Sequence, residues 1–265
     1  KLTYQVSEKN RVFGMFEYDH VENERRGIDA YTFPEAARKQ DGPGVSFSVN
    51  WESILNSSNF LNVKLTGYDG NDDYLPYNGT DTPGHEDLYG HTGWSLVNAK
   101  MQDLSHRHLV TGDASWSLFK DGLFGKNDSH SFKFGALYEK ASTTDEWRRN
   151  GGFTYYDDSS LCPGSGANPE EDPEQYEAEQ TANYLRDPSC GWYERSTGYG
   201  EYEVHAEHTG YTFYAQDSIR LSRVTINAGL RYTNYSAGWR EGFGNPDVYE
   251  VDFVDPRIGF SWDVR

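Results

Sequence analysis

Apolar and polar residues alternate along much of the chain. From Val224 to Tyr232 every second residue is apolar, and the positions between them are mostly polar. A period of two is typical of a β-strand with one apolar and one polar face. The same pattern recurs at 2–6, 12–18, 45–51, 61–65, 110–118, 132–138, before Leu221 and at 258–264. The pattern therefore predicts about nine strands and an all-β fold.

The segments between these strands fall into two length classes. Tight turns are predicted at 7–10, 56–59, 120–128 and 221–223, and long loops at 21–43, 69–104, 141–203 and 236–252. The two classes alternate strictly, and successive connections of antiparallel strands lie at opposite ends of a sheet. Short turns at one end and long loops at the other are typical of an outer-membrane β-barrel, with periplasmic turns and extracellular loops. A soluble sandwich gives no reason for this sorting.

Composition fits strands that bury only one face. Mean hydropathy is −0.85, yet aromatic residues make up 15% of the chain. No run of about 18 apolar residues exists, so no transmembrane helix is predicted. The net charge of −18 argues against nucleic acid as a partner, because phosphates require a basic surface. The charge indicates either solvated, self-repelling loops or a surface that captures cations.

The apolar faces could meet lipid or the core of a sandwich. Three tryptophans lie on these faces, late in strands that run toward a tight turn: Trp51, Trp116 and Trp262. Their common level favours a lipid-facing aromatic girdle, and their alternative role is the core of a sandwich. The polar positions of the segment Val224 to Tyr232 are then expected to face a polar lumen, namely Thr225, Asn227 and Arg231.

Several segments resemble one family. The segment "YTFYAQDSIRLSRVTINAGLRY" at 211–232 resembles a strand, turn and strand of TonB-dependent outer-membrane receptors, and "VDPRIGFSW" at 254–262 resembles the strand that follows there. The segments "KLTYQVSEKNRVFGMFEYDHVENERRG" and "HSFKFGALYE" resemble hairpins of the Oar-like branch. Members of that branch often carry a carboxypeptidase-regulatory-like domain.

The resemblance implies a plugged transmembrane barrel of about 22 strands. It also implies energy-coupled uptake of an unidentified ligand, with the TonB complex as partner and no cofactor. Residues 1–265 are then expected to be a partial barrel domain, without the plug or the segment that contacts TonB. Two alternatives stay open: a non-transporting outer-membrane adhesin or structural protein, and a soluble β-sandwich that binds carbohydrate.

Both cysteines of the chain, Cys162 and Cys190, lie in the longest predicted loop. An even count in an extracytoplasmic loop predicts a disulfide, and two free thiols are the alternative. A zinc pair is not favoured, because no histidine lies at ligand spacing beside either cysteine. The same loop contains a turn-rich acidic tract at 163–180.

Two short patterns bear on metal binding. Asp69, Asn71 and Asp73 alternate like the start of a calcium loop, but the later glutamate of such a loop is missing. His106 and His108 share one face of a strand and could ligate a metal, although interfacial packing is the commoner role. We therefore predict no metal site. Motifs of hydrolases, metalloproteases and P-loop enzymes are absent, so the chain is not expected to be an enzyme.

Overall fold

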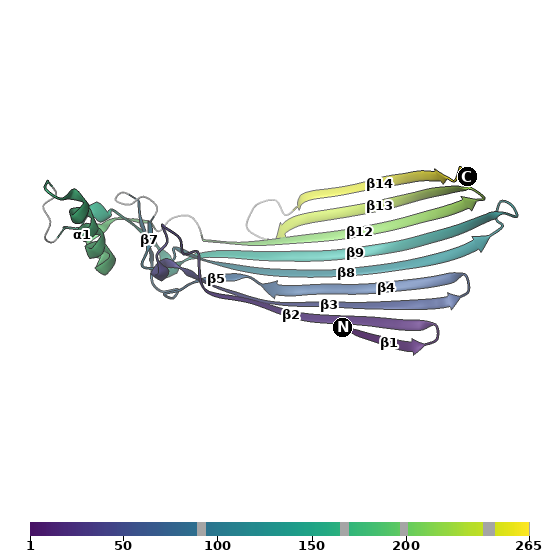
Figure 1. Ribbon diagram of the computed structural model, residues 1–265, viewed down its shortest axis with the longest axis horizontal. Helices are drawn as coiled ribbons and strands as arrows, with labels where there is room; N and C mark the ends of the chain where they lie inside the picture. Colours follow the sequence, from purple (N-terminus) through teal and green to yellow (C-terminus); the bar gives the residue numbers. More distant parts are fainter. Residues whose placement is uncertain (89–93, 165–169, 197–200, 241–246, 265) are drawn as a thin grey trace.

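Most of the chain forms one long antiparallel sheet. The computed structural model describes residues 1–88, 94–164, 170–196, 201–240 and 247–264. In this part of the chain nine strands follow one another in the main sheet (Figure 1): β1 (Leu2–Ser7), β2 (Asn10–Arg26), β3 (Arg38–Asn56), β4 (Asn59–Asn71), β8 (Met101–Asp121), β9 (Asp128–Arg149), β12 (Tyr202–Leu221), β13 (Val224–Arg240) and β14 (Asp247–Trp262). The predicted all-β fold is confirmed.

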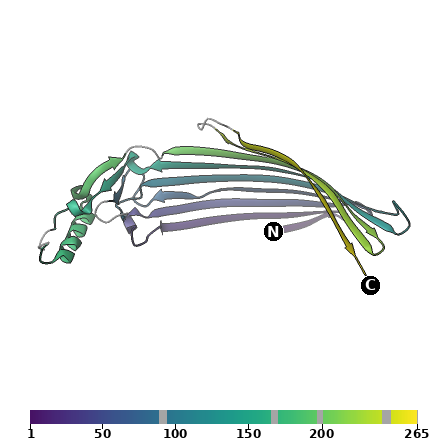
Figure 2. The same ribbon diagram turned by 90° about the horizontal axis from the view of Figure 1, so that it is seen from above.

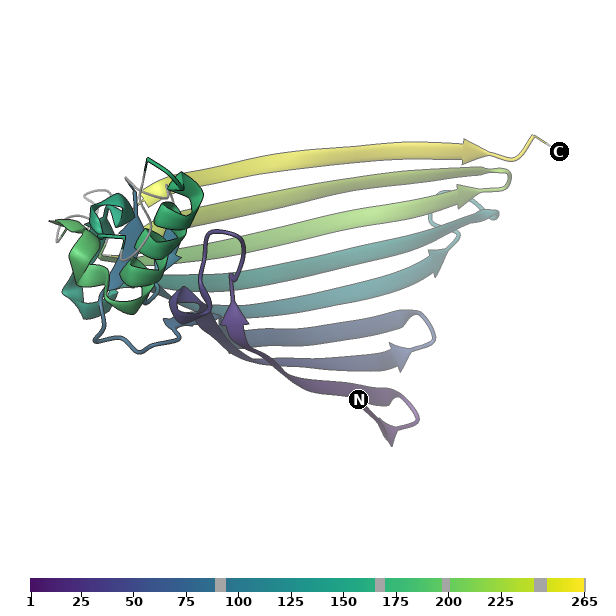
Figure 3. The same ribbon diagram turned by 60° about the vertical axis from the view of Figure 1, so that its left-hand side comes forward.

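The main sheet is open and bent. Strands β1 and β14 lie at its opposite edges, so the two chain ends are far apart across the sheet (Figure 3). Seen from above, the strands curve along their length (Figure 2). The short strand β5 (Asp73–Pro76) continues the line of β4 after a break at Asp72 and pairs with β3 and β8.

The four tight turns lie where the sequence predicts them. They connect β1 to β2, β3 to β4, β8 to β9, and β12 to β13, and all lie at the end of the sheet away from α1 (Figure 1). In the turn between β12 and β13, Ser222 has a positive φ of 53°. Two-residue hairpin loops accept this backbone because its twist matches that of the flanking strands.

The long loops begin later and end earlier than predicted. The expected boundaries were 21–43, 69–104, 141–203 and 236–252, but β2 continues to Arg26 and β9 to Arg149. The reason is that a β-ladder needs backbone partners rather than apolar side chains. Beyond the apolar pattern, polar pairs such as His20 with Asp41, at 2.6 Å, lie across the paired strands.

Two long loops combine into a small second sheet that the sequence did not predict. It has the order β11-β10-β6-β7 and consists of β6 (Gly84–Asp87), β7 (Trp94–Leu96), β10 (Thr154–Asp157) and β11 (Trp192–Ser196). Strands β6 and β10 pair in parallel, although they come from different loops. Together with helix α1 (Pro173–Arg186) these strands form what we call the loop module, at one end of the main sheet (Figures 1 and 3).

Helix α1 begins inside the turn-rich acidic tract at 163–180. Asp172 caps the helix, because its side chain accepts a hydrogen bond from the backbone of Gln175, and Pro173 is the first helical residue. An Asp-Pro-Glu start is a recognised helix signal, and here it was hidden in a loop-like composition. Four short 3-10 helices complete the described elements: η1 (Pro34–Ala36), η2 (Asn150–Gly152), η3 (Ser159–Leu161) and η4 (Pro188–Gly191).

The buried apolar cluster of the described residues lies in the loop module. Cys162 and Tyr184 are fully buried there, and Phe33, Val97 and Cys190 pack against them. The apolar side chains of the main sheet are instead exposed along most of its length. A face of this kind is stable only against another apolar phase.

Candidate functional site

The cross-strand register gives the main sheet two chemically different faces. One row of paired residues crosses all nine strands and is apolar throughout: Tyr4, Val12, Trp51, Val63, Ala114, Ala136, Phe213, Tyr232 and Val254. A nearby row crosses the same strands on the other face: Gln5, Arg11, Glu52, Asn62, Ser115, Gly135, Tyr214, Arg231 and Asp255. The register therefore places the apolar residues of all nine strands on the same side of the sheet. The sheet has an apolar face and a polar face.

The three predicted girdle tryptophans all lie on the apolar face at the tight-turn end. The exposed fractions are 38% for Trp51, 39% for Trp116 and 63% for Trp262. The indole Nε1 of Trp51 donates to Asn10 at 3.2 Å, and that of Trp116 donates to Asn59 at 3.0 Å.

Those two asparagines are the first residues of β2 and β4, and Trp262 pairs with the first residue of β13. The three rings are therefore at similar distances from their turns. A ring with an apolar body and a bonded N–H suits a boundary between lipid and water. Their role as a girdle stays a prediction.

Tyrosines mark the opposite limit of the apolar face, and this role was not predicted from the sequence. Tyr138 and Tyr211 face each other across β9 and β12, with ring centroids 5.3 Å apart. The next residues on that face toward the loops are Lys140 and Thr209. The alternation of apolar and polar residues places the two tyrosines on the apolar face, but only the strand register shows that they lie side by side where that face ends.

The polar face carries the residues expected to face a lumen. Asn227 and Arg231 line a cavity of about 580 Å³ with Lys133, Gln216 and Arg257, while Thr225 lies outside it on the same face. The Arg231 guanidinium donates to the hydroxyl groups of Thr233 at 3.2 Å and Thr212 at 3.4 Å. Arg257 is paired with Asp255 at 2.8 Å.

A second cavity of about 310 Å³ lies where the main sheet meets the loops, and we call it the loop-end cavity. Among its lining residues are three cations and three further side chains: Arg26, Arg38, Lys100, Met101, Asp103 and Trp147. They come from β2, β3, β8, β9 and the segment before β8. The net negative charge of the chain does not predict this basic cavity.

The two arginines of the loop-end cavity are held by one tyrosine. Arg26 and Arg38 each lie with the guanidinium carbon 5.1 Å from the ring centroid of Tyr74. Arg26 also donates to Gln40 at 2.5 Å, and Gln40 donates to Asp72 at 2.7 Å. These bonds fix the position of the Arg26 head relative to the strands.

The other charged groups of the loop-end cavity differ in character. Lys100 is already paired with Glu86 at 2.6 Å. Burial raises the pKa of the Asp103 carboxyl, and the nearby Arg38 charge acts in the opposite direction. Two cations and one carboxylate therefore remain in the cavity without an ion pair among the described residues, which leaves it a net positive charge.

The two metal-binding patterns of the sequence meet on the apolar side of the strands, beyond the tyrosines. Nε2 of His106 and Nδ1 of His108 lie 3.3 Å and 3.1 Å from the same Oδ2 of Asp69. The hydrogen bond from His108, followed by that from His106, lowers the pKa of Asp69. Asp73 is not part of this group, because its Oδ1 accepts the backbone N–H of Ser105.

Hydrogen bonding to one carboxylate accounts for both histidines. Within the described ranges, no group of three or more metal-ligating side chains is arranged to hold an ion.

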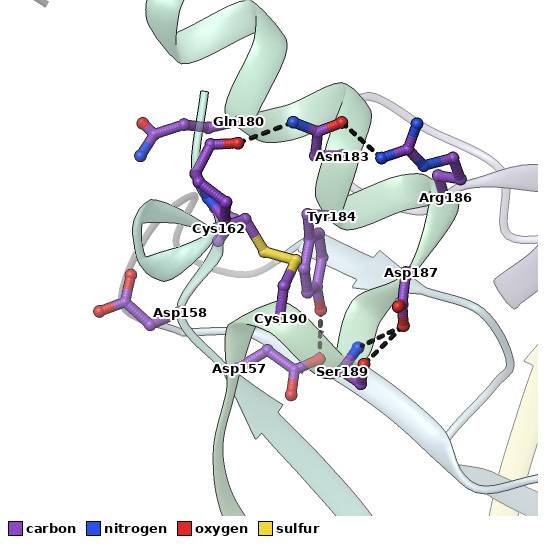
Figure 4. Close-up of a disulfide and its surroundings, with 12 residues drawn as sticks. Asp157, Asp158, Cys162, Gln180, Asn183, Tyr184, Arg186, Asp187, Ser189 and Cys190 are labelled. Carbon is purple, nitrogen blue, oxygen red and sulfur yellow. Dashed lines mark hydrogen bonds between the residues drawn. A yellow bond between two sulfur atoms is a disulfide. The ribbon is translucent and has the colours of Figure 1, made fainter. Parts of the chain in front are cut away.

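The disulfide between Cys162 and Cys190 is confirmed. The two Cα atoms are 5.0 Å apart, and the bond joins η3 to η4 beside α1 (Figure 4). Next to it the Tyr184 hydroxyl donates to Oδ2 of Asp157, which also contacts Nδ1 of His85 at 2.6 Å. Burial, followed by the bond to Asp157, raises the pKa of the Tyr184 phenol well above its usual value.

In the part of the chain that the structure describes, no helix has the length and apolarity needed to cross a membrane.

Comparisons with known proteins agree with the two-faced sheet. A family model for the outer membrane beta barrel domain matches residues 1–254. No curated protein matches the chain.

Among solved structures, the chain is similar to the outer membrane transporter YddB from Escherichia coli, with a TM-score of 0.60 and 13% identity over 99% of this chain and 28% of that one. It is also similar to the siderophore receptor PiuA from Acinetobacter baumannii, with a TM-score of 0.56 and 13% identity over 99% of this chain and 39% of that one. A third similar structure is the ferric citrate transporter FecA in its unliganded form, with a TM-score of 0.56 and 13% identity over 99% of this chain and 32% of that one. At this identity the likeness shows the fold, and the chain spans about a third of the length of these proteins.

Proposed function

We propose that this chain, which belongs to the outer membrane β-barrel domain family and lies in the bacterial outer membrane, is part of the wall of a TonB-dependent receptor. In this proposal the receptor takes up a ligand through a plugged barrel, and the energy comes from the TonB complex through regions outside these residues. Within that family, the sequence resembles the Oar-like branch. No enzymatic step is proposed.

The proposal rests on the two rows of paired residues, one apolar and one polar, that each cross all nine strands of the main sheet. An apolar row and a polar row that both cross every strand suit a wall between lipid and an aqueous lumen. In this assignment Trp51, Trp116 and Trp262 contact lipid near the periplasmic boundary, and Tyr138 and Tyr211 lie near the outer one. Thr225, Asn227 and Arg231 then face the lumen.

The sorting of connections supports a receptor over a simple pore. Tight turns fit the periplasmic end, and the disulfide-bonded loop module fits the extracellular end. A folded module of this kind is more than a barrel wall needs for closure. The solved structures with the same fold are described as transporters and receptors, which supports the same role here.

The proposal is tested by binding of the periplasmic domain of TonB to the native, full-length protein purified in detergent. We expect saturable binding, measured by biolayer interferometry, and loss of binding when the segment of the native polypeptide that precedes its plug is deleted. Absence of binding in the intact protein would overturn the receptor proposal and favour an adhesin or structural barrel.

A further inference from the structure

We propose that the loop-end cavity binds an organic anion, with its carboxylate or phosphate oxygens on Arg26 and Arg38 and its apolar part on Trp147. This inference rests on the proposed receptor function, because it names the ligand class that such a receptor would take.

Among the described residues the two arginines form no ion pair, and the carboxylate of Asp103, which lines the same cavity, offsets only part of their charge. Both guanidinium groups stand over the single ring of Tyr74 at 5.1 Å. Two like charges held on one ring repel each other, in a chain whose net charge is −18. A bound anion with two or more oxygens would remove this repulsion, since guanidinium groups bind such oxygens in pairs.

Hydrogen bonds hold the Arg26 head in place before any ligand binds, and the Tyr74 ring that they also fix lies under Arg38. Arg26 donates to Gln40, and Gln40 in turn donates to the hydroxyl of Tyr74 at 3.2 Å. The Tyr74 hydroxyl donates to Asp72 at 3.2 Å. All of these residues lie on paired strands or at the break between β4 and β5, and groups on rigid elements lose little entropy on binding.

The cavity also has an apolar part. The indole of Trp147 is 38% exposed and stacks on Tyr202 with centroids 5.3 Å apart. Ala36 and Ala99 line the same cavity and are buried. The volume of about 310 Å³ suits a small organic molecule, because such sites start at roughly 300 Å³. A cavity with two cations and an apolar wall selects an anion with a carbon skeleton over an inorganic one.

The larger cavity of about 580 Å³ carries this inference less well. One of its cations, Arg257, is neutralised by Asp255 on the same strand, and another, Arg231, bonds to two threonines.

The test uses the full-length protein in detergent and follows Trp147 fluorescence during titration with citrate, hexanoate or inorganic phosphate, with glycerol as an uncharged probe. We expect the organic anions to change the fluorescence saturably and glycerol to leave it unchanged. The double variant Arg26→Gln with Arg38→Gln should weaken organic-anion binding by about tenfold or more, as expected when charge-assisted hydrogen bonds are lost. The variant Trp147→Phe identifies the part of the signal that comes from this cavity.

Arg25→Gln is the matched control. Arg25 is adjacent to Arg26 and has the same kind of contact, with its guanidinium 4.5 Å over the Tyr77 ring, but it does not line the cavity. Equal weakening by Arg25→Gln would show a general charge effect and overturn the inference. So would the absence of organic-anion binding in a protein that still binds TonB, and that result would leave the receptor function standing. Binding of phosphate as tight as that of hexanoate would overturn the role of the apolar wall.

Discussion

At the scale of single residues, the two faces of β13 differ between immediate neighbours. Ile226 belongs to the apolar face and Asn227 to the polar face, where it lines the larger cavity. Ile226 is two residues from Val224, which pairs with Trp262 at the predicted girdle. Replacing Ile226 with Arg should therefore destabilise the barrel by about 1–2 kcal/mol, between the values for the boundary and the midplane of the bilayer. The same change at Asn227 should cost much less, because a lumen is polar. Urea unfolding of the full-length protein in lipid vesicles measures both.

A second pair adds an apolar position on β9 and a further polar position on β13. Phe134 on β9 lies on the apolar face, stacked on Trp116 at 5.6 Å, and Phe134→Arg should resemble Ile226→Arg. Thr225→Arg should resemble Asn227→Arg. Equal destabilisation by changes on the two faces would contradict a wall between lipid and lumen.

The buried phenol of Tyr184 makes the loop module sensitive to alkaline pH. Its pKa in the folded module is raised above the usual value of about 10. A raised pKa means that the stabilisation is fully present below about pH 10 and is lost as the pH rises above it, because the unfolded module releases this proton first. We therefore expect proteolysis of the module to accelerate above about pH 10, and Tyr184→Phe to weaken this acceleration. An identical alkaline profile for the variant would contradict the prediction.

At the scale of secondary structure elements, the sequence predicts the strands and tight turns, which depend on local patterns. It does not predict the features that form from segments far apart in the chain. The strands and tight turns follow from period-two patterns and turn residues that lie within each segment. The loop module does not, because β6 and β10 are short, polar and drawn from loops about 70 residues apart. The loop-end cavity could not be predicted from the sequence for the same reason. Arg26 and Arg38 are partners across β2 and β3, and Trp147 comes near them only through the pairing of β3 with β5, of β5 with β8 and of β8 with β9.

The disulfide should stabilise the loop module and have little effect on the main sheet. Cys162 and Cys190 are 28 residues apart, so closing this loop contributes about 3–4 kcal/mol in the chain-entropy model. Replacing both cysteines with Ser should make residues 150–201 sensitive to protease while the barrel keeps its heat-modifiable migration on gels. Chemical reduction of the unmodified protein should have the same effect. Loss of the barrel along with the module would show that the two fold as one cooperative unit.

At the scale of the whole molecule, the main sheet leaves backbone groups without strand partners. Within the described ranges β1 pairs only with β2, and β14 only with β13. An unpaired strand edge is not stable in hydrocarbon, because no water is present to satisfy its N–H and C=O groups. Either further strands of the same polypeptide or neighbouring copies must therefore close the wall.

Closure by further strands predicts a heavy native polypeptide. Residues 1–265 have a mass of 30.2 kDa and cover only 28% to 39% of the three similar transporters. A barrel of about 22 strands with a plug needs a mass several times larger. Intact-mass spectrometry of the protein from its own outer membrane measures this directly. A mass near 30.2 kDa would contradict a plugged single-chain barrel, because nine strands would then have to close with those of other copies. Chemical cross-linking of β1 to β14 between copies would distinguish that arrangement.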